Sequence, residues 1–147
     1  MLRTAHILLF SAVILPAGLW AQAPGRHPGY DHALSDLRYA RALLEAGPQW
    51  GHVARDDERA VAEIDRAIQE CRRATWEDGR NPNARPAVDA HWLPRERLRR
   101  AEDVLSKARH DLDHEEDNPG ARGLRDRAWF HIDEAQRAVA HAMSEWR

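Results

Sequence analysis

The chain has 147 residues, with 22 arginine and lysine residues against 24 aspartate and glutamate residues, and its formal net charge is −2. This length allows one domain with its own hydrophobic core. The nearly balanced charge argues against a surface for nucleic acid or for an anionic membrane. Because Cys71 is the one cysteine, an intramolecular disulfide is excluded.

The first 23 residues have the pattern of an export signal. Arg3 precedes an apolar run at residues 7–15, and the triplet AQA at residues 21–23 fits the small-x-small rule for a cleavage site. The run is too short for a stable transmembrane anchor, which is the alternative. We therefore expect residues 1–23 to be a cleaved signal peptide and residues 24–147 to form one exported domain, periplasmic or extracellular, with no membrane span.

Two helices are predicted in the first half of the mature chain. The first runs from about Pro28 to Ala46 and ends at Gly47. The second begins near Asp56 or Asp57, whose carboxylates suit a helix N-terminus, and runs to Asp78. Apolar side chains spaced by three and four residues predict the buried face of each helix. These are Tyr30, Ala33, Leu37, Ala40 and Leu44 in the first helix, and Ala60, Ile64, Ala67, Cys71 and Ala74 in the second.

Two further helices follow a long connection. Residues 80–93 contain two prolines and two asparagines and are predicted to form that connection. The third helix begins at Pro94, a residue favoured at the first helical position. Asn118 and Pro119 predict the start of the last helix, which runs to about Met143. The buried faces expected here are Leu98, Ala101, Leu105, Ala108 and Leu112, followed by Ala128, Ile132, Ala135, Val139 and Ala142.

The two halves of the mature chain resemble each other. Residues 37–40 (LRYA) parallel residues 98–101 (LRRA), and residues 64–67 (IDRA) parallel residues 132–135 (IDEA). We therefore predict an all-α fold, an up-down-up-down four-helix bundle made of two similar helical hairpins. The alternative is a pair of hairpins that dimerise through exposed apolar faces, so a homo-oligomer stays open.

The sequence carries no recognisable catalytic motif. It has no phosphate-binding loop, dinucleotide fingerprint or haem-attachment motif. Ser35, Ser106 and Ser144 have no nucleophile-elbow context. His131 and Glu134 occur in the reverse of the Glu-x-x-His order that di-iron bundles use. We therefore expect no enzymatic activity and no catalytic cofactor.

Histidine is the residue type that offers a binding site. In the predicted topology, the starts of the first and third helices share one pole with the ends of the second and fourth. That pole collects His27, His32, His91 and His141. We predict it as the first-choice site for copper, zinc or nickel, because ligands from separate segments can surround a cation. The alternative at this pole is an aromatic plug formed by Tyr30, Trp76, Trp92 and Trp146.

His110 and His114, one turn apart on the third helix, form the second-choice metal site, with solvated side chains at a helix end as the alternative. Beside the apolar face of the last helix, His131 is expected to be hydrogen-bonded rather than to bind a metal. Phe130 is expected to point away from the core and, with Trp129, to mark a partner surface.

The lone cysteine lies on the predicted buried face of the second helix. We therefore expect Cys71 to be a shielded thiol that packs as a small apolar side chain. The alternative is a disulfide between two copies of the chain.

Residues 27–38 (HPGYDHALSDLR), together with residues 89–91 (DAH) and 117–119 (DNP), resemble a group of uncharacterised secreted bacterial helical-bundle proteins. This resemblance covers most of the mature chain and implies export and a helical bundle, but no activity. The pattern at residues 131–141 is more weakly similar to the repeats of small periplasmic metal-binding four-helix bundles, which are richer in histidine. We expect a non-catalytic exported protein with a binding or structural role in the cell envelope and an unknown protein partner. The alternative is low-affinity periplasmic binding of copper, zinc or nickel.

Overall fold

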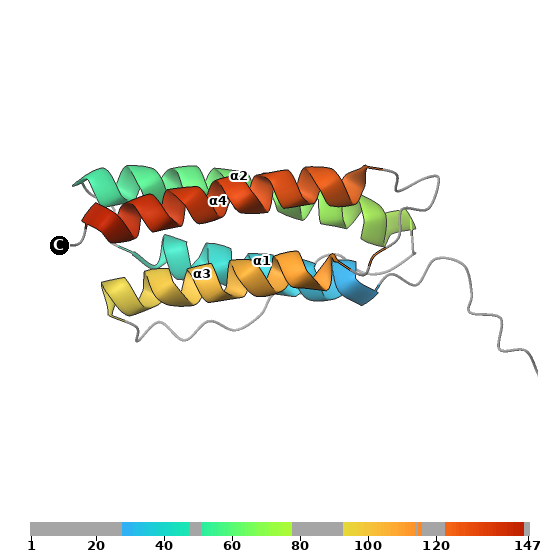
Figure 1. Ribbon diagram of the computed structural model, residues 1–147, viewed down its shortest axis with the longest axis horizontal. Coiled ribbons are helices and arrows are strands. Elements are labelled where there is room, and N and C mark those ends of the chain that lie inside the picture. The colour runs from blue at the N-terminus through green and yellow to red at the C-terminus, as the bar shows by residue number, and fades with distance from the viewer. Residues whose placement is uncertain (1–27, 48–50, 78–92, 114, 116–122, 146–147) are drawn as a thin grey trace, which may run out of the picture.

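The computed structural model describes residues 28–47, 51–77, 93–113, 115 and 123–145. Four helices pack against one another (Figure 1): α1 (Pro28–Glu45), α2 (Gly51–Glu77), α3 (Pro94–Asp111) and α4 (Leu124–Glu145). No strand occurs among these residues, so the all-α prediction is confirmed. Nor is any helix of the described chain long and apolar enough to cross a membrane. The predicted signal peptide lies outside the described residues.

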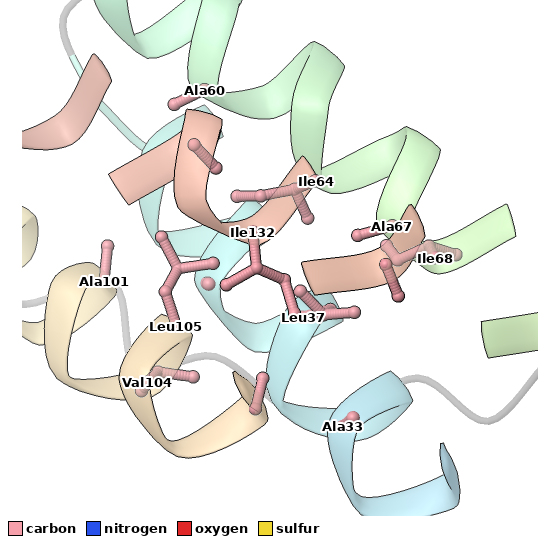
Figure 2. Close-up of a cluster of buried hydrophobic side chains, with 14 of the residues drawn as sticks. Ala33, Leu37, Ala60, Ile64, Ala67, Ile68, Ala101, Val104, Leu105 and Ile132 are labelled. Atoms are coloured by element: carbon pink, nitrogen blue, oxygen red, sulfur yellow. The ribbon is translucent and has the colours of Figure 1, made fainter. Parts of the chain in front are cut away.

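The core is built from the faces that the helical spacing predicts. Every position predicted for the four buried faces is at most 1% exposed. Figure 2 shows side chains from all four helices meeting in the interior, among them Leu37, Ile64, Leu105 and Ile132. Buried positions beside these faces widen each of them, as is usual for helices in a globular core. The additional positions are Leu34, Leu43, Ala54, Ile68, Val104, Leu124 and Ala138.

The directions of the helices follow from contacts near their ends. Arg97 at the start of α3 contacts Leu43 near the end of α1, so α1 and α3 run antiparallel. Arg97 also contacts Asp57 near the start of α2, so α2 and α3 run parallel. Asp56 near the start of α2 contacts His141 near the end of α4, so α2 and α4 run antiparallel. The order is up-down-down-up, as Figure 1 shows, and the predicted up-down-up-down order is wrong.

The length of the connection explains this difference. A short loop forces consecutive helices to be antiparallel neighbours, but a long one allows the chain to return to the end from which it came. Residues 78–92 lie outside the described residues, and a segment of this length can reach on the order of 50 Å when extended. The 18 residues of α3 measure about 27 Å, so the connection can span the bundle.

Each helix packs most extensively against its counterpart in the other half of the sequence. These contacts join α1 to α3 and α2 to α4, and Figure 1 shows the two pairs as two layers. The helices within each pair share the sequence echoes of the two halves and run antiparallel. The helices with similar sequences in the two halves, α1 with α3 and α2 with α4, are therefore packed against each other.

Two helix starts differ from their predictions. The second helix begins at Gly51, before the predicted cap, because Asp57 is a buried side chain within the helix and not a cap. The last helix begins at Leu124, since Gly123 has a φ of +77° and interrupts any helix that started earlier. The predicted start of the third helix at Pro94 is confirmed.

Candidate functional site

A buried arginine from α3 caps the C-terminal end of α1. The Arg97 Nη1 atom donates to the carbonyl oxygens of Leu43 (2.8 Å) and Leu44 (3.0 Å). Carbonyls in the last turn of a helix lack intrahelical donors, and a positive charge is favoured there. A Cβ atom added to Gly47 would lie 2.2 Å from Arg97 Nη2, so the glycine leaves room for the guanidinium group.

Asp57 of α2 completes this buried group. Its Oδ2 atom accepts a hydrogen bond from Arg97 Nη2 at 3.2 Å, and the two side chains are 7% and 4% exposed. Burial raises the pKa of the Asp57 carboxyl, and the opposing effect of the Arg97 charge is smaller. The Asp57 Oδ1 atom has no hydrogen-bond partner among the described residues. The pair joins three helices but is costly to desolvate.

The N-terminal end of α1 is capped by a charge of the opposite sign. The backbone N–H of Gly29 donates to Oε1 of Glu115, a buried residue just after α3. A carboxylate is favoured at a helix N-terminus. A Cβ atom on Gly29 would lie 2.1 Å from the carbonyl oxygen of Asp111, so glycine permits the close approach of α1 to α3. The chain at and after α3 therefore supplies both caps of α1.

Between these caps, one lysine links two carboxylates across the α1–α3 contact. Lys107 Nζ donates to Asp36 Oδ2 at 2.5 Å and lies 3.5 Å from Asp111 Oδ2. Burial raises the pKa of the Asp36 carboxyl; Lys107 lowers this pKa, and Asp111 raises it further. The Asp111 Oδ2 atom is buried without a hydrogen-bond partner among the described residues. This group therefore has two acids and one base.

A row of charged pairs joins α2 to α4. Acidic residues recur every seven positions on α2 and face basic residues of α4 in antiparallel order. The pairs are Asp56–His141 (2.7 Å), Glu63–His131 (2.8 Å) and Glu70–Arg127 (3.0 Å). The hydrogen bond to Asp56 raises the pKa of His141, and the Asp56 charge adds to the effect. The predicted hydrogen-bonded role of His131 is confirmed.

The structure separates two of the four histidines that were predicted to form the first-choice metal site. His32 lies near the start of α1 and His141 near the end of α4, and Figure 1 shows these two helix ends at opposite ends of the bundle. His27 and His91 lie outside the described residues. The predicted pole depended on alternating helix directions, so the corrected topology removes the reason for placing His32 beside His141.

The second-choice metal site is described only in part. The His110 side chain is 71% exposed, and its Nδ1 atom lies 3.2 Å from Asp113 Oδ2 on the same helix turn. His114 lies outside the described residues. Within the part of the chain that the structure describes, no group of three or more histidine, cysteine, aspartate or glutamate side chains is arranged to hold a metal ion.

Cys71 is buried and free of disulfide bonds in the described chain, as its place on the apolar face of α2 predicts. Burial, with a smaller contribution from the Glu70 charge, raises the pKa of the Cys71 thiol to about 12. The thiol is therefore protonated at neutral pH and shielded from reagents.

The start of α4 presents two aromatic side chains in different ways. Trp129 is half-buried, and the guanidinium carbons of Arg109 and Arg125 lie 4.9 and 4.8 Å from the ring centroid. The Trp129 Nε1 atom also donates to the Arg109 carbonyl oxygen at 3.3 Å. Phe130 is 57% exposed, which confirms its predicted outward orientation.

Sequence reasoning missed the buried charges, although a signal for them was present. Arg97 lies four residues before Ala101 and Asp57 seven before Ile64, so both charged residues continue the apolar face of their helix. Opposite charges at such positions on two predicted helices indicate a buried pair, because neither is tolerated in a core alone.

The charged groups described above are the caps of α1 with Asp57, the cluster of Asp36, Lys107 and Asp111, and the row between α2 and α4. The pairs Arg41–Asp65 and Arg109–Asp133 also join helices. Each group acts between helices. No protein-family model, curated protein or solved structure matches this chain.

Proposed function

We propose that this protein is a non-catalytic helical bundle that is exported from the cell and acts in the envelope, by binding a partner or as a structural component. The proposal rests on the structural role of the buried charged side chains. Asp57, Arg97 and Glu115 are buried, and each holds one helix to another. A catalytic acid or base must reach its substrate, so these three side chains are placed for stability.

Export is tested with the full chain, carrying a C-terminal tag and expressed in a bacterial host. The leader-like pattern at residues 1–23 supports export, so the tagged protein should appear outside the cytoplasmic membrane and begin at Pro24. Fractionation followed by N-terminal sequencing measures both properties. Tagged protein that stays in the cytoplasm with Met1 intact would contradict this part of the proposal.

The non-catalytic part is tested by replacing the buried charges together. An ion pair in a core can be exchanged for apolar side chains of similar volume without loss of stability. The double variant D57L/R97M should therefore restore the envelope phenotype of a deletion strain as well as the natural chain does. A folded, normally abundant double variant that fails to restore it would show that these charges have a chemical role.

A second proposal is low-affinity binding of copper, zinc or nickel. It is favoured by the contacts of His131 and His141, each of which uses Nδ1 toward a carboxylate. Metal-ligating histidines commonly have this arrangement, with the other ring nitrogen on the ion. The two histidines are ten residues apart on α4, about 15 Å, so each would hold a separate ion weakly.

Titration of the mature protein with Cu²⁺, followed by tryptophan fluorescence, tests this second proposal. Quenching should saturate, and the variant H131Q/H141Q should lose the saturable part. H32Q is the matched control, because His32 is an exposed histidine on α1 outside the row between α2 and α4, and it should quench as the parent does. Quenching that never saturates, or that is equal in all three proteins, would contradict metal binding at these residues.

A further inference from the structure

Asp36 of α1 and Asp111 of α3 bring two carboxylates together with a single cation between them. Lys107 Nζ lies 2.5 Å from Asp36 Oδ2 and 3.5 Å from Asp111 Oδ2. The two aspartate side chains are only 19% and 18% exposed, whereas Lys107 is 61% exposed. With all three groups ionised, the cluster has one negative charge in excess.

One buried oxygen of this cluster has no close hydrogen bond. The Asp111 Oδ2 atom has no hydrogen-bond partner among the described residues, and the Lys107 ammonium that it shares with Asp36 lies 3.5 Å away. Two ionised carboxylates cannot bond to each other, because both are acceptors only. A buried acceptor with only a long contact to a donor lowers stability, and a proton on the Asp36 carboxyl would supply a closer donor.

The two carboxylates cannot relieve the conflict by moving apart, because the α1–α3 contact is held on both sides of them. On one side, Gly29 lies against the Asp111 carbonyl oxygen and donates to Glu115. On the other side, Arg97 donates to the Leu43 carbonyl oxygen. Proton uptake is therefore the available response.

The charges that face Asp36 come from α3. Burial is the largest effect and raises the pKa of Asp36, Lys107 lowers it, and Asp111 raises it. On α1 itself, His32 lies one turn before Asp36 and is exposed. The acidic side chains that α2 and α4 direct at α1 and α3 include Asp57, Asp65 and Asp133. They pair with Arg97, Arg41 and Arg109, respectively.

We propose that Asp36 and Asp111 form a proton-sharing carboxyl pair, in which protonated Asp36 donates to Asp111 Oδ2 and fastens α1 to α3 more tightly in acidic surroundings. The proton comes from the solvent. Asp111 stays ionised, and Lys107 keeps its charge and balances it. This carboxyl pair is a property of the fold, so its proposed behaviour does not depend on the proposed role in the envelope.

The direction of the pH dependence follows from the raised pKa of Asp36. The folded protein binds this proton at pH values where the unfolded chain, with a pKa near 3.8, does not. The contribution of Asp36 to the free energy of unfolding is therefore greatest below that unfolded pKa. It is lost as the pH rises through the folded pKa.

The test compares the mature chain with the variant D36N, whose amide is a permanent donor of similar shape. At pH 7 the urea midpoint of D36N should exceed that of the parent, because the amide supplies the missing donor. The lost contact with exposed Lys107 is worth little. This advantage should shrink as the pH is lowered through the raised pKa of Asp36, since the parent then takes up its own proton. The matched control is D65N, which removes a carboxylate paired with Arg41 of α1 and should show no such gain.

An NMR titration of the side-chain carboxyls gives a readout that does not depend on stability. In the parent, the Asp36 carboxyl should titrate above the ordinary range of aspartate. The proposal is overturned if Asp36 titrates at or below that range. It is also overturned if D36N lowers the urea midpoint at pH 7 as D65N does.

Discussion

Arg97 and Asp57 occupy positions on the buried faces of their helices, where the spacing of three and four residues predicts apolar side chains. Each is tolerated because the other is present and because the carbonyl oxygens of Leu43 and Leu44 accept two further hydrogen bonds. The same burial that makes the pair costly also makes it specific, since the guanidinium group has to meet three separate acceptors. The pair fixes the relative positions of α1, α2 and α3 at one end of the bundle.

Replacing one member of the pair should lower the free energy of unfolding far more than replacing both. R97M leaves the Asp57 charge buried without compensation, and we expect a loss of about 3–5 kcal/mol in the free energy of unfolding. Urea denaturation measures it. The double variant D57L/R97M should recover most of the loss. Equal stability of parent and R97M would mean that the pair is solvated and not buried.

The thiol of Cys71 should be inert in the folded protein. Its pKa of about 12 leaves almost no thiolate at pH 8, and the side chain has no exposed surface. A bulky thiol reagent should therefore label the native protein much more slowly than the protein in concentrated urea. Rapid labelling of the native protein, or a dimer band on a non-reducing gel, would show that Cys71 is accessible and favour pairing between copies.

At the scale of the element, α1 is a helix whose end charges come from another part of the chain. A helix of 18 residues in a protein gains most of its stability from tertiary packing, and both of its ends need partners. Glu115 meets its N-terminal amide and Arg97 its C-terminal carbonyl oxygens, each with the sign that the helix dipole favours. The order of α1 therefore depends on α3 being in place.

The substitution G29A tests this dependence. The added Cβ atom would lie 2.1 Å from a backbone oxygen of α3, which cannot rotate away as a side chain could. We expect a loss of about 1–3 kcal/mol and faster hydrogen exchange in α1 than in α4. The control is S35A on the exposed side of the same helix, which should change neither. A neutral G29A would mean that α1 and α3 are farther apart than described.

At the scale of the whole molecule, one core is shared by all four helices (Figure 2). Neighbouring positions of α4 give a matched comparison, because Ile132 is fully buried and Phe130 is 57% exposed. I132A should lower the free energy of unfolding by about 2–5 kcal/mol. F130A should change it by no more than about 0.5 kcal/mol, despite removing the larger side chain. Thermal or urea unfolding measures both, and similar losses in the two variants would contradict the described packing.

The order of helix directions can be tested by cross-linking. In a C71A background, D56C/H141C should be joined efficiently by a short bismaleimide, because the start of α2 meets the end of α4. H32C/H141C should not be joined within one molecule, since these positions lie at opposite ends of the bundle. Mass spectrometry of the digested product identifies the link. The reverse outcome would restore the alternating order that the sequence predicted.

The candidate sites were predictable only where they depended on local pattern. The hydrogen bond of His131 was predicted because this residue lies beside the buried face of its helix, and the structure identifies Glu63 as the partner. The shared pole of His32 and His141 was not found, since it required the direction of every helix to be right. The caps of α1 were missed because Glu115 and Arg97 are distant from α1 in the sequence and act on its backbone.

The sequence by itself determined the four helices and the faces they bury, because a spacing of three and four residues is a property of each helix alone. All the predicted face positions, from Tyr30 to Ala142, are buried. Which face meets which, and in what direction, was decided only by the tertiary structure. An apolar face does not specify its partner, and the long segment at residues 78–93 permits either direction for α3. The choice rests on contacts between distant residues, above all those of Arg97 with α1 and α2.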